Sequence, residues 1–344
     1  MSDRKTQFKE EYPDRFLLTN DIESVQKFIK EHRFTKNGTG LLSLEKPGEG
    51  NMNCVLRARM DDESTFIIKQ SRPWVEKYDQ IDAPEDRILV EKTYYEILSE
   101  NELLNKYSPK VLGVDEESRI LILEDLGEAS DLTYLYQPDK NFSEQEVSSC
   151  IEYVNQLPKL ENLNKVPDNL KMRQLNHQHI FHLPLINENG FDLDEIQPGL
   201  QSISMELKSD RELQYRVTEL GEVYLGKGNV LVHGDFYPGS ILNTDQGIRV
   251  IDPEFAFIGP NEWDIAVFVA HLCMSHMDLD KVMEVFNEFE QPKKFDMKQF
   301  SGFVGVEIIR RIIGLAQLPL TLSILQKQSL LNKATQWVKN GKIK

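Results

Sequence analysis

The sequence predicts an α+β protein of two lobes, with a β-rich first lobe and a mainly helical second lobe. Two observations carry this prediction. Up to about residue 125, short runs of apolar and β-branched residues are separated by charged turns, which is typical of antiparallel strands. Beyond that point, most segments space their apolar residues as helices do. We place the first lobe at residues 1–124, the second at 125–344 and a hinge near 124–127.

The composition narrows the functional classes. The chain of 344 residues carries a formal net charge of −16, which argues against a nucleic-acid partner because such a partner needs a basic face. The three cysteines are widely spaced, which suits reduced thiols better than a disulfide framework or a zinc site. The charged N-terminal segment shows no secretory signal, and no apolar run is long enough to cross a bilayer. We expect a soluble cytoplasmic protein.

Local signals define the elements of the first lobe in order. The segment 19–21 offers a cap for a helix that begins at Ile22. A glycine-rich piece, KPGEGNMNCVLRARM, leads into two strands, CVLRARM and TFIIK, which the charged turn 61–64 joins as a hairpin. Residues 85–104 are typical of a helix, in which Glu91 interrupts the apolar stripe. Two further strands, VLGVD and RILILED, complete a small sheet with an inserted helix.

The second lobe begins with a helix. Ser143 and Glu146 form a capping-box pattern for a helix that ends before Pro158. Residues 167–198 are loop-rich, and another helix follows at roughly 209–226. Two short strands, NVLVHGD and GIRVIDP, are then linked by a turn at Thr244 to Gly247. The remainder of the chain reads as helices, with breaks at points such as Gly302 and Pro319.

The segment LVHGDFYPGSILNTDQGIRVIDPEFAF, residues 231–257, contains the acidic residues best placed for chemistry. Asp235 follows a strand, in a turn where a carboxylate can orient a hydroxyl and accept its proton. Asp252 and Glu254 are two apart in what we interpret as an extended segment, so both side chains point the same way. Two hard oxygen ligands suit Mg²⁺, which binds carboxylates together with phosphate oxygens and water. Either aspartate alone could cap a strand end, but their order and spacing together favour a functional site.

The order of these residues matches a kinase catalytic loop. Such loops read H-x-D-x-x-x-x-N and are followed, after a short hairpin, by a metal-binding Asp. Here the sequence has His233-Gly234-Asp235, Ser240 at the Asn position, and then Asp252. A serine hydroxyl is a weaker metal ligand than an asparagine carbonyl, and Glu254 could supply the missing charge. We expect His233 to brace the loop through hydrogen bonds rather than to transfer protons.

This region resembles the aminoglycoside phosphotransferase and choline kinase group, whose loop reads HGDxxxxN. Within that group it is more similar to the methylthioribose kinase family, where Ser replaces the Asn and the metal motif is DPE. The run VIDPEFAFxGPxxxDI, residues 250–265, is much more specific than HGD alone. The resemblance implies a protein-kinase-like fold, ATP and Mg²⁺ as cofactors, Asp235 as the catalytic residue, and Asp252, Glu254 and Ser240 as metal ligands.

The first lobe contains, in the same order as that family, the elements of a nucleotide site. The glycine-rich piece has a flexible backbone that could cover phosphates, Lys69 ends the second hairpin strand, and Glu91 offers it an ion-pair partner. Taken singly, these are a turn, a solvated lysine and an exposed helical charge. As an ordered set that includes GxGNxNxVxR, they resemble the family. The ATP-binding residues that this implies are Gly48, Gly50, Asn51, Asn53, Lys69, Glu91 and the hinge residues Glu124, Asp125 and Leu126.

A pair of arginines, Arg310 and Arg311, interrupts the apolar helix VGVEIIRRIIGLAQL. Neighbouring helical residues point about 100° apart, so the residues alone favour one arginine in an internal ion pair and the other at the surface. The family resemblance implies instead that both bind the hydroxyls of the acceptor beside Asp235. Tyr237 and Pro238 stand where the family generally has His-Thr, and we include Tyr237 among the acceptor residues.

Two further features have ordinary interpretations. The run HQHIFH places His177, His179 and His182 close together, but no cysteine or second acidic cluster accompanies them. We interpret this run as a loop or short strand near the substrate entrance rather than as a metal site. For Trp74 and Trp263, packing is a better interpretation than stacking on a ligand.

The predicted activity is ATP- and Mg-dependent phosphorylation of a small-molecule hydroxyl. The family resemblance points to 5-methylthioribose as the acceptor and to its 1-phosphate as the product, a reaction of methionine salvage. Two alternatives stay open: a kinase of another sugar, amino alcohol or aminoglycoside, and a nucleotide-binding pseudokinase, against which Lys69, Asp235 and Asp252 argue. The expected partners are the acceptor and ATP, with a homodimer allowed and with neither nucleic acid nor membrane.

Overall fold

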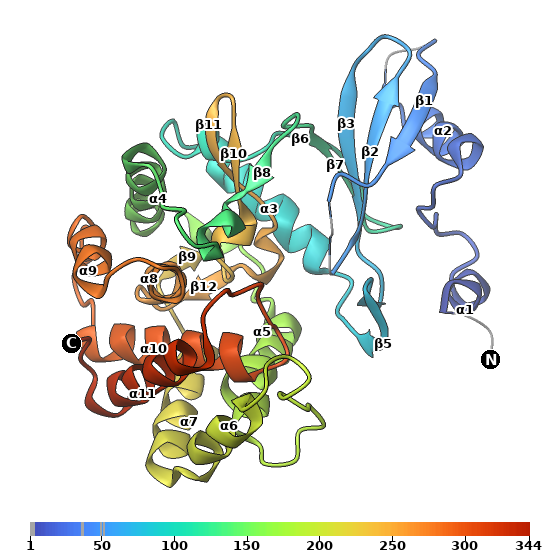
Figure 1. Ribbon diagram of the computed structural model, residues 1–344. Helices are drawn as coiled ribbons and strands as arrows, with labels where there is room; N and C mark the ends of the chain where they lie inside the picture. The colour runs from blue at the N-terminus through green and yellow to red at the C-terminus, as the bar shows by residue number, and fades with distance from the viewer. Residues whose placement is uncertain (1–3, 36–37, 49, 51) are drawn as a thin grey trace. The chain divides into compact units, whose positions relative to one another are not determined.

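The computed structural model describes residues 4–35, 38–48, 50 and 52–344 of the chain. The chain divides into two compact units, Met1–Glu128 and Ala129–Lys344 (Figure 1). The predicted lobe boundary after residue 124 lies close to this division, and the hinge itself stays a prediction.

The first unit is built on one antiparallel sheet of strand order β1-β2-β3-β7-β6. Both predicted hairpins are present in this sheet, because β2 pairs with β3 and β6 pairs with β7. The elements of the unit are α1 (Arg4–Glu11), α2 (Ile22–Glu31), β1 (Leu41–Glu45), β2 (Cys54–Met60), β3 (Thr65–Gln70), β4 (Trp74–Val75), β5 (Tyr78–Asp82), α3 (Arg87–Ser99), β6 (Val111–Asp115) and β7 (Ile120–Glu124).

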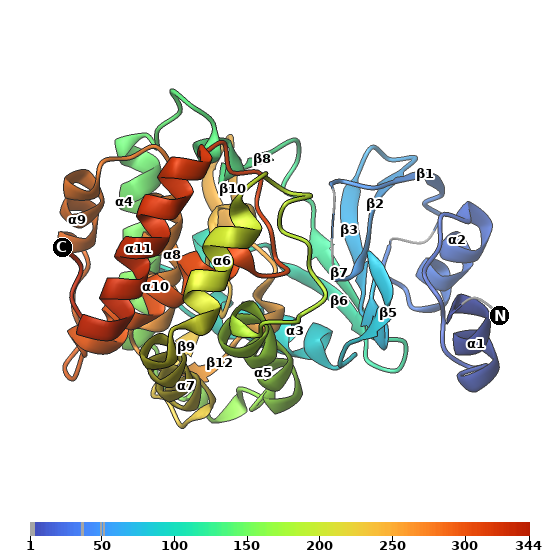
Figure 2. The ribbon, with the colours of Figure 1, turned by 60° about the horizontal axis from the view of Figure 1, so that its bottom comes forward.

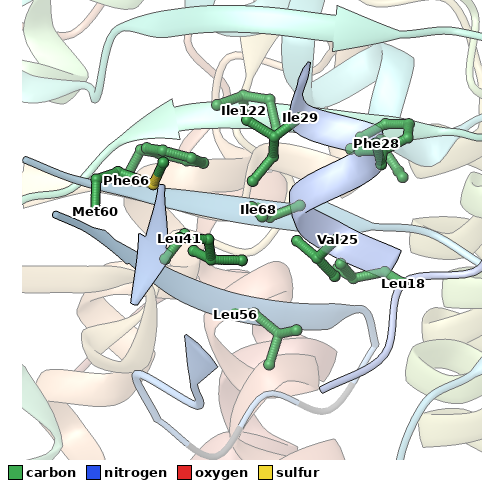
Figure 3. Close-up of a cluster of buried hydrophobic side chains, with 12 residues drawn as sticks. Leu18, Val25, Phe28, Ile29, Leu41, Leu56, Met60, Phe66, Ile68 and Ile122 are labelled. Atoms are coloured by element: carbon green, nitrogen blue, oxygen red, sulfur yellow. The ribbon is translucent and has the colours of Figure 1, made fainter. Parts of the chain in front are cut away.

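Helix α2 packs its apolar stripe against the sheet. The carboxylate of Asp21 caps the helix by accepting from the backbone N–H of Glu23, as the sequence predicted. Val25, Phe28 and Ile29 of α2 then share one buried cluster with side chains from strands β1, β2, β3 and β7 (Figure 3). Full burial of such a side chain contributes roughly 1.5–3 kcal/mol, so this layer holds the sheet that carries Lys69.

Helix α3 is shorter than the predicted 85–104. It ends at Ser99, and Asn101 explains the end. The side-chain oxygen of Asn101 accepts from the backbone N–H groups of Leu103 and Leu104, which offers the chain a turn in place of a further helical turn. Glu91 is buried on this helix.

The second unit is mainly helical and holds short strands. Its elements are β8 (Ser130–Asp131), α4 (Glu144–Gln156), α5 (Leu170–His177), α6 (Leu200–Ser209), α7 (Arg211–Leu225), β9 (Val230–Val232), β10 (Ile241–Thr244), β11 (Gly247–Val250), β12 (Phe257–Gly259), α8 (Trp263–Met274), α9 (Leu279–Asn287), α10 (Met297–Ile313) and α11 (Ile324–Asn340). The predicted capping box is confirmed, because Ser143 and Glu146 exchange hydrogen bonds at the start of α4.

The two strands NVLVHGD and GIRVIDP are not joined directly by the predicted turn. The turn at residues 244–247 is present, but it joins β11 to an additional strand, β10, whereas β9 pairs with β12 in a separate two-stranded sheet. Residues 233–240 therefore form a loop that leaves β9 and enters β10. This loop carries Asp235, and a second loop between β11 and β12 carries the DPE motif.

Helix α10 runs unbroken through Gly302, against the predicted break. A Cβ at Gly302 would lie 2.7 Å from a methyl carbon of Leu220 on α7, and one at Gly305 would lie 2.6 Å from the carbonyl oxygen of Ala334 on α11. The glycines thus serve close helix packing, and α11 runs alongside α10 in both views (Figures 1 and 2). This packing fixes the last turn of α10, which holds the arginine pair.

The stretch predicted as loop-rich contains helix α5, which continues into a π-helical segment, Gln178–His182. Met172, Asn176 and Ile180 are buried at a spacing of four, which is the signal of a helix. The prediction of a loop or short strand for HQHIFH is therefore wrong.

Candidate active site

The catalytic loop is held by a buried carboxylate. Asp264 at the start of α8 accepts from the backbone N–H groups of His233, at 2.6 Å, and Gly234, at 3.1 Å. The indole N–H of Trp263 donates to the Gly234 carbonyl at 3.0 Å. Gly234 has φ +90°, and a Cβ there would overlap the carbonyl of Phe255, so the turn before Asp235 requires glycine. Trp263 packs as predicted, and its N–H also fixes the loop.

The role of Asp264 was not visible from its sequence position. Burial raises the pKa of Asp264 to about 7, which outweighs the opposite effect of the His233 and Gly234 N–H donors. Its position inside the run GPxxxDI is the only sequence signal that could have pointed to it.

His233 joins the catalytic loop to the metal-motif loop. Its Nε2 lies 2.9 Å from the carbonyl oxygen of Ile251, directly before Asp252, and its Nδ1 lies 3.4 Å from the backbone nitrogen of Asp235. Because a carbonyl only accepts, Nε2 carries the proton in this arrangement and Nδ1 accepts. The ring braces two loops, as we expected from the sequence.

Asp235 meets both arginines. Its Oδ1 accepts from Nη2 of Arg310 at 2.9 Å and from Nη2 of Arg311 at 2.8 Å. The Asp235 side chain is 20% exposed, while those of the arginines are only 5% and 6% exposed. Among the described residues, Oδ2 of Asp235 has no hydrogen-bond partner. Both arginine contacts of the carboxylate are therefore made by one oxygen.

The expectation that neighbouring arginines on a helix cannot face one spot is wrong. Glu307, one turn earlier on α10, accepts from Nε of Arg310 through Oε2 and from Nε of Arg311 through Oε1, the latter at 2.8 Å. The Cα–Cβ directions do diverge, but each long side chain curves back to the shared carboxylate. Sequence reasoning missed Glu307, although its i,i+3 and i,i+4 spacing to the arginines was a usable signal.

Glu307 is ionised and buried. Burial alone would raise its pKa, but Arg310, Arg311 and a hydrogen bond from His271 hold the pKa well below its ordinary value. Two cations and two anions, counting Asp235, balance in this cluster.

Tyr237 lies over one arginine. Its ring centroid is 4.6 Å from the guanidinium carbon of Arg311, within cation–π distance. Burial, with the nearby carboxylate of Asp235, raises the pKa of Tyr237 to about 12 despite the opposing charge of Arg311. The phenol is neutral and forms an uncharged wall next to Asp235.

The metal motif is not extended, which corrects our expectation for Asp252 and Glu254. Asp252 is left-handed, with φ 62°, and Pro253–Phe255 forms a 3₁₀ turn. Asn169, before α5, donates to the carbonyls of Glu254 and Ala256 at 3.0 Å each and so holds this turn. Asn169 lies in the stretch 167–198, which we expected to be loop-rich.

Ser240 is joined to the residue before this motif by a backbone hydrogen bond. It is buried and ends the 3₁₀ turn Pro238–Ser240, and its carbonyl accepts from Ile251 N–H at 2.9 Å. The part of the chain that the structure describes holds no group of three His, Cys, Asp or Glu side chains suited to a metal. A motif of two carboxylates fits Mg²⁺, which takes one or two protein carboxylates plus phosphate oxygens, better than a cation that needs a closed protein cage.

In the first unit, Lys69 and Glu91 form a buried ion pair. The distance from Nζ to Oε2 is 2.6 Å, and the side chains are 3% and 0% exposed. The ordinary interpretations of a solvated lysine and an exposed helical charge are therefore wrong. Strand β3 and helix α3 together hold one ammonium group at a fixed place.

The glycine-rich piece is partly described. Gly48 has open space around its Cα, and at Gly50 a Cβ would make only ordinary contacts, so neither is required for packing. The side-chain oxygen of Asn53 accepts from Nε of the buried Arg87 at 2.9 Å, which ties the end of this piece to α3. Asn51 lies outside the described residues.

The segment after β7 is clamped by Arg57 of β2. Its Nη2 donates to Oδ1 of Asp125 at 3.2 Å and to the Gly127 carbonyl at 2.8 Å, and Nε lies 2.9 Å from Oδ2 of Asp125. Glu124 instead accepts from the backbone N–H of Lys110 at 3.1 Å. Of the predicted hinge side chains, those of Glu124 and Asp125 therefore have partners within the first unit.

A family comparison decides the class of the protein. A family model described as "Phosphotransferase enzyme family" matches residues 57–277. This is more than half of the 344 residues. The chain belongs to this phosphotransferase family.

Individual proteins agree with that assignment. The protein of Bacillus cereus (strain B4264) called methylthioribose kinase is 25% identical over 370 residues, which cover 95% of this chain and 92% of that protein. The AMP-bound spectinomycin phosphotransferase superposes with a TM-score of 0.52 at 12% identity, over 93% of each chain. An amicoumacin kinase in complex with AMP-PNP and Ca²⁺ gives 0.51 at 14% identity, over 97% of this chain and 96% of the other.

These findings confirm the predicted recognition, the kinase-like fold and the enzymatic class. The phosphotransferase has the fold of the kinases named above and transfers a phosphoryl group to a small-molecule hydroxyl, with ATP as the donor that the family implies. Across the described ranges, the phosphotransferase has no helix with the length and apolar character of a membrane span.

Proposed function

We propose that this phosphotransferase uses Mg²⁺-ATP to phosphorylate the anomeric hydroxyl of 5-methylthioribose, giving the 1-phosphate in methionine salvage. The observation that carries the proposal is the contact of Asp235 with both Arg310 and Arg311. The relative from Bacillus cereus named methylthioribose kinase, similar over 95% of this chain, supports the choice of acceptor.

The acceptor residues suit a neutral polyol. Asp235 offers Oδ2 to the attacking hydroxyl, while Arg310 and Arg311 donate to neighbouring sugar oxygens. The charges of this cluster already balance, so a cationic acceptor would gain little from it. We assign the thioether group to the neighbourhood of the neutral Tyr237 ring, one face of which lies over Arg311.

Phosphoryl transfer depends chiefly on positioning and on neutralising charge. Asp235 aligns the hydroxyl toward the donor phosphate and takes its proton late, because bonding to the nucleophile is weak in a loose transition state. Lys69, fixed by Glu91, holds phosphate oxygens of ATP. Asp252, Glu254 and Ser240 would hold Mg²⁺, which when bound neutralises charge on the phosphates.

We also assign the glycine-rich piece and the hinge to the nucleotide site. Gly48, Gly50 and Asn51 cover the phosphates, and Asn53 anchors that piece through Arg87. Backbone groups of Glu124–Leu126 pair with adenine, in a segment that Arg57 holds in place.

A second candidate is a kinase of another small acceptor. Tyr237 favours it, because a tyrosine that stacks on Arg311 occupies the position where the family has histidine. The test is a comparison of initial rates with methylthioribose, ribose, choline, homoserine and kanamycin at equal concentration. Methylthioribose should be fastest, and faster turnover of choline, homoserine or kanamycin would defeat the sugar assignment and leave the general phosphotransferase.

We also propose a cytoplasmic location. The three cysteines, Cys54, Cys150 and Cys273, are free, and burial raises the thiol pKa of each. Reduced, unreactive thiols are typical of cytosolic proteins. A homodimer stays a prediction, which sedimentation of the purified protein would test.

A further inference from the structure

Behind the two arginines, buried side chains continue the network away from Asp235. Oε1 of Glu307, on α10, lies 3.1 Å from Nε2 of His271 on α8. Nδ1 of His271 lies 2.5 Å from the hydroxyl of Tyr136, which ends the 3₁₀ helix Leu132–Tyr136. All three side chains are fully buried. Three separate elements therefore converge on the carboxylate that holds the arginine pair.

One arrangement of protons satisfies these contacts. Ionised Glu307 only accepts, so Nε2 of His271 must donate to it. Burial lowers the pKa of His271 to about 4, so the ring is neutral and carries its single proton on Nε2. Nδ1 then accepts from Tyr136, whose pKa burial raises well above its ordinary value, so that its hydroxyl keeps the proton. The two hydrogen bonds therefore run the same way: Tyr136 donates to His271, and His271 donates to Glu307.

These hydrogen bonds reach the proposed acceptor site through the guanidinium groups of Arg310 and Arg311. Each is held at two points, by Glu307 at Nε and by Asp235 at Nη2, and a planar group held at two points cannot turn. Oε1 of Glu307 is shared between Arg311 and His271, so the imidazole fixes the plane of the carboxylate. If that plane rotates, both arginines lose their common anchor.

We propose that Tyr136, His271 and Glu307 are positioning residues that set the two guanidinium groups in the orientation in which they hold Asp235 and the acceptor. The proposal rests on the proposed acceptor role of Asp235 and the arginines. These three side chains are fully buried, and they act through Arg310 and Arg311.

The test compares two replacements of the imidazole. His271→Gln keeps an N–H donor near the position of Nε2, whereas His271→Ala removes it and leaves Glu307 short of one partner. A lost hydrogen bond to a buried charge corresponds to about a tenfold or larger rise in acceptor KM. We expect this rise in His271→Ala, with the KM for ATP unchanged, and recovery of most of it in His271→Gln.

A matched control separates positioning from stability. Val269→Ala removes buried volume from another face of the same helix. We expect it to lower Tm without a change in either KM. Equal KM values for the acceptor in His271→Gln and His271→Ala, or an equal rise in the KM for ATP, would overturn the proposal.

Tyr136→Phe tests the hydrogen bond between Tyr136 and His271. It should raise acceptor KM by a few-fold, and combining it with His271→Ala should add nothing, because both changes break the same hydrogen-bond network. Full additivity of the two effects would show that Tyr136 does not act through His271.

The proposal can fail separately from the proposed function. If another acceptor turns over faster than methylthioribose, the acceptor assignment fails, and the same KM comparison is made with that acceptor. A crystal structure of His271→Ala gives a result independent of any acceptor. Both guanidinium groups should leave their places on Asp235 and Glu307, and unchanged places would overturn the proposal.

Discussion

The two units each bury charged side chains, but they do so differently. In the first unit, one ammonium group meets one carboxylate, Lys69 with Glu91. In the second, two guanidinium groups lie between two carboxylates, Asp235 and Glu307. Both arrangements balance their charges, as buried ions must.

The difference lies in what the carboxylates do. In the first unit Glu91 holds one ammonium group, which our proposal assigns to the phosphates of ATP. In the second, Glu307 holds both guanidinium groups at Nε, and Asp235 accepts from both at Nη2 through a single oxygen. In our proposal, one carboxylate of the cluster is the anchor of the arginines and the other is the base.

Replacing the base should have the largest effect on turnover. Asp235→Asn removes the proton acceptor, and general base catalysis contributes about 10²–10⁴-fold, so kcat should fall by at least that much. Binding of Mg²⁺-ATP should stay nearly intact, since no nucleotide residue changes. Titration calorimetry and an ADP-release assay measure the two effects, and the kinase assignment fails if wild type binds no nucleotide at millimolar Mg²⁺.

Lys69→Met should weaken ATP binding, which Asp235→Asn leaves nearly intact. A charge-assisted hydrogen bond is worth about 1.5–3 kcal/mol, so the KM for ATP should rise roughly 10–100-fold while acceptor KM stays constant. Tm should fall too, because Glu91 loses the ammonium 2.6 Å away. Adding Glu91→Leu should restore Tm but leave ATP binding weak, and restored ATP binding would show that Lys69 is only structural.

Arg310→Lys and Arg311→Lys should each raise acceptor KM by about tenfold and spare ATP. Lysine cannot donate to Glu307 and Asp235 at once in the planar fork that arginine uses. Initial-rate kinetics with each substrate varied in turn measures this. A rise confined to the KM for ATP would place the arginines in the nucleotide site instead.

Glu254→Gln should raise the Mg²⁺ concentration required for half-maximal activity by several-fold. Ser240 offers a weak ligand, so the metal depends on the two carboxylates of the motif. Ser240→Asn should partly rescue the variant. An unchanged Mg²⁺ dependence in Glu254→Gln would mean that this side chain only supports the turn.

Gly305→Ala should change stability and leave both KM values alone. Its Cβ would lie 2.6 Å from the backbone of α11, and overpacking of this kind costs about 1–3 kcal/mol. The Tm measured by calorimetry should fall by a few degrees. The variant therefore separates a general loss of stability in the second unit from the specific effects at its arginines.

The elements that could be predicted are those whose signals are local. The capping box of Ser143 and Glu146 and the hairpin of β2 and β3 involve near neighbours in sequence, and both are present. Helix α5 was missed although Asn169, a residue type that commonly starts helices, stands directly before it; in the structure Asn169 is left-handed and forms no side-chain cap.

The sequence indicated which residues belong to the candidate site, but not which of them contact one another. Asp235 and the arginine pair were identified, but their meeting spans 75 positions in the chain. The directions of neighbouring residues on a helix describe their Cβ atoms, whereas guanidinium groups lie several bonds further out and can reach one shared carboxylate. Asp264 and Asn169 bind backbone groups of distant loops, and no pattern within their own segments marks such contacts.

Because His233 bridges two loops, exchanging one of these loops between related proteins would disturb the other. One imidazole fixes the spacing between the loop that presents Asp235 and the loop that presents Asp252, while Asp264 fixes the backbone at the histidine itself. A graft of either loop alone would separate the imidazole from its carbonyl, whereas a graft of residues 231–265 keeps His233, Asp264 and both loops together. The recipient would still have to supply Asn169, which holds the turn at Glu254, and the two arginines that contact Asp235.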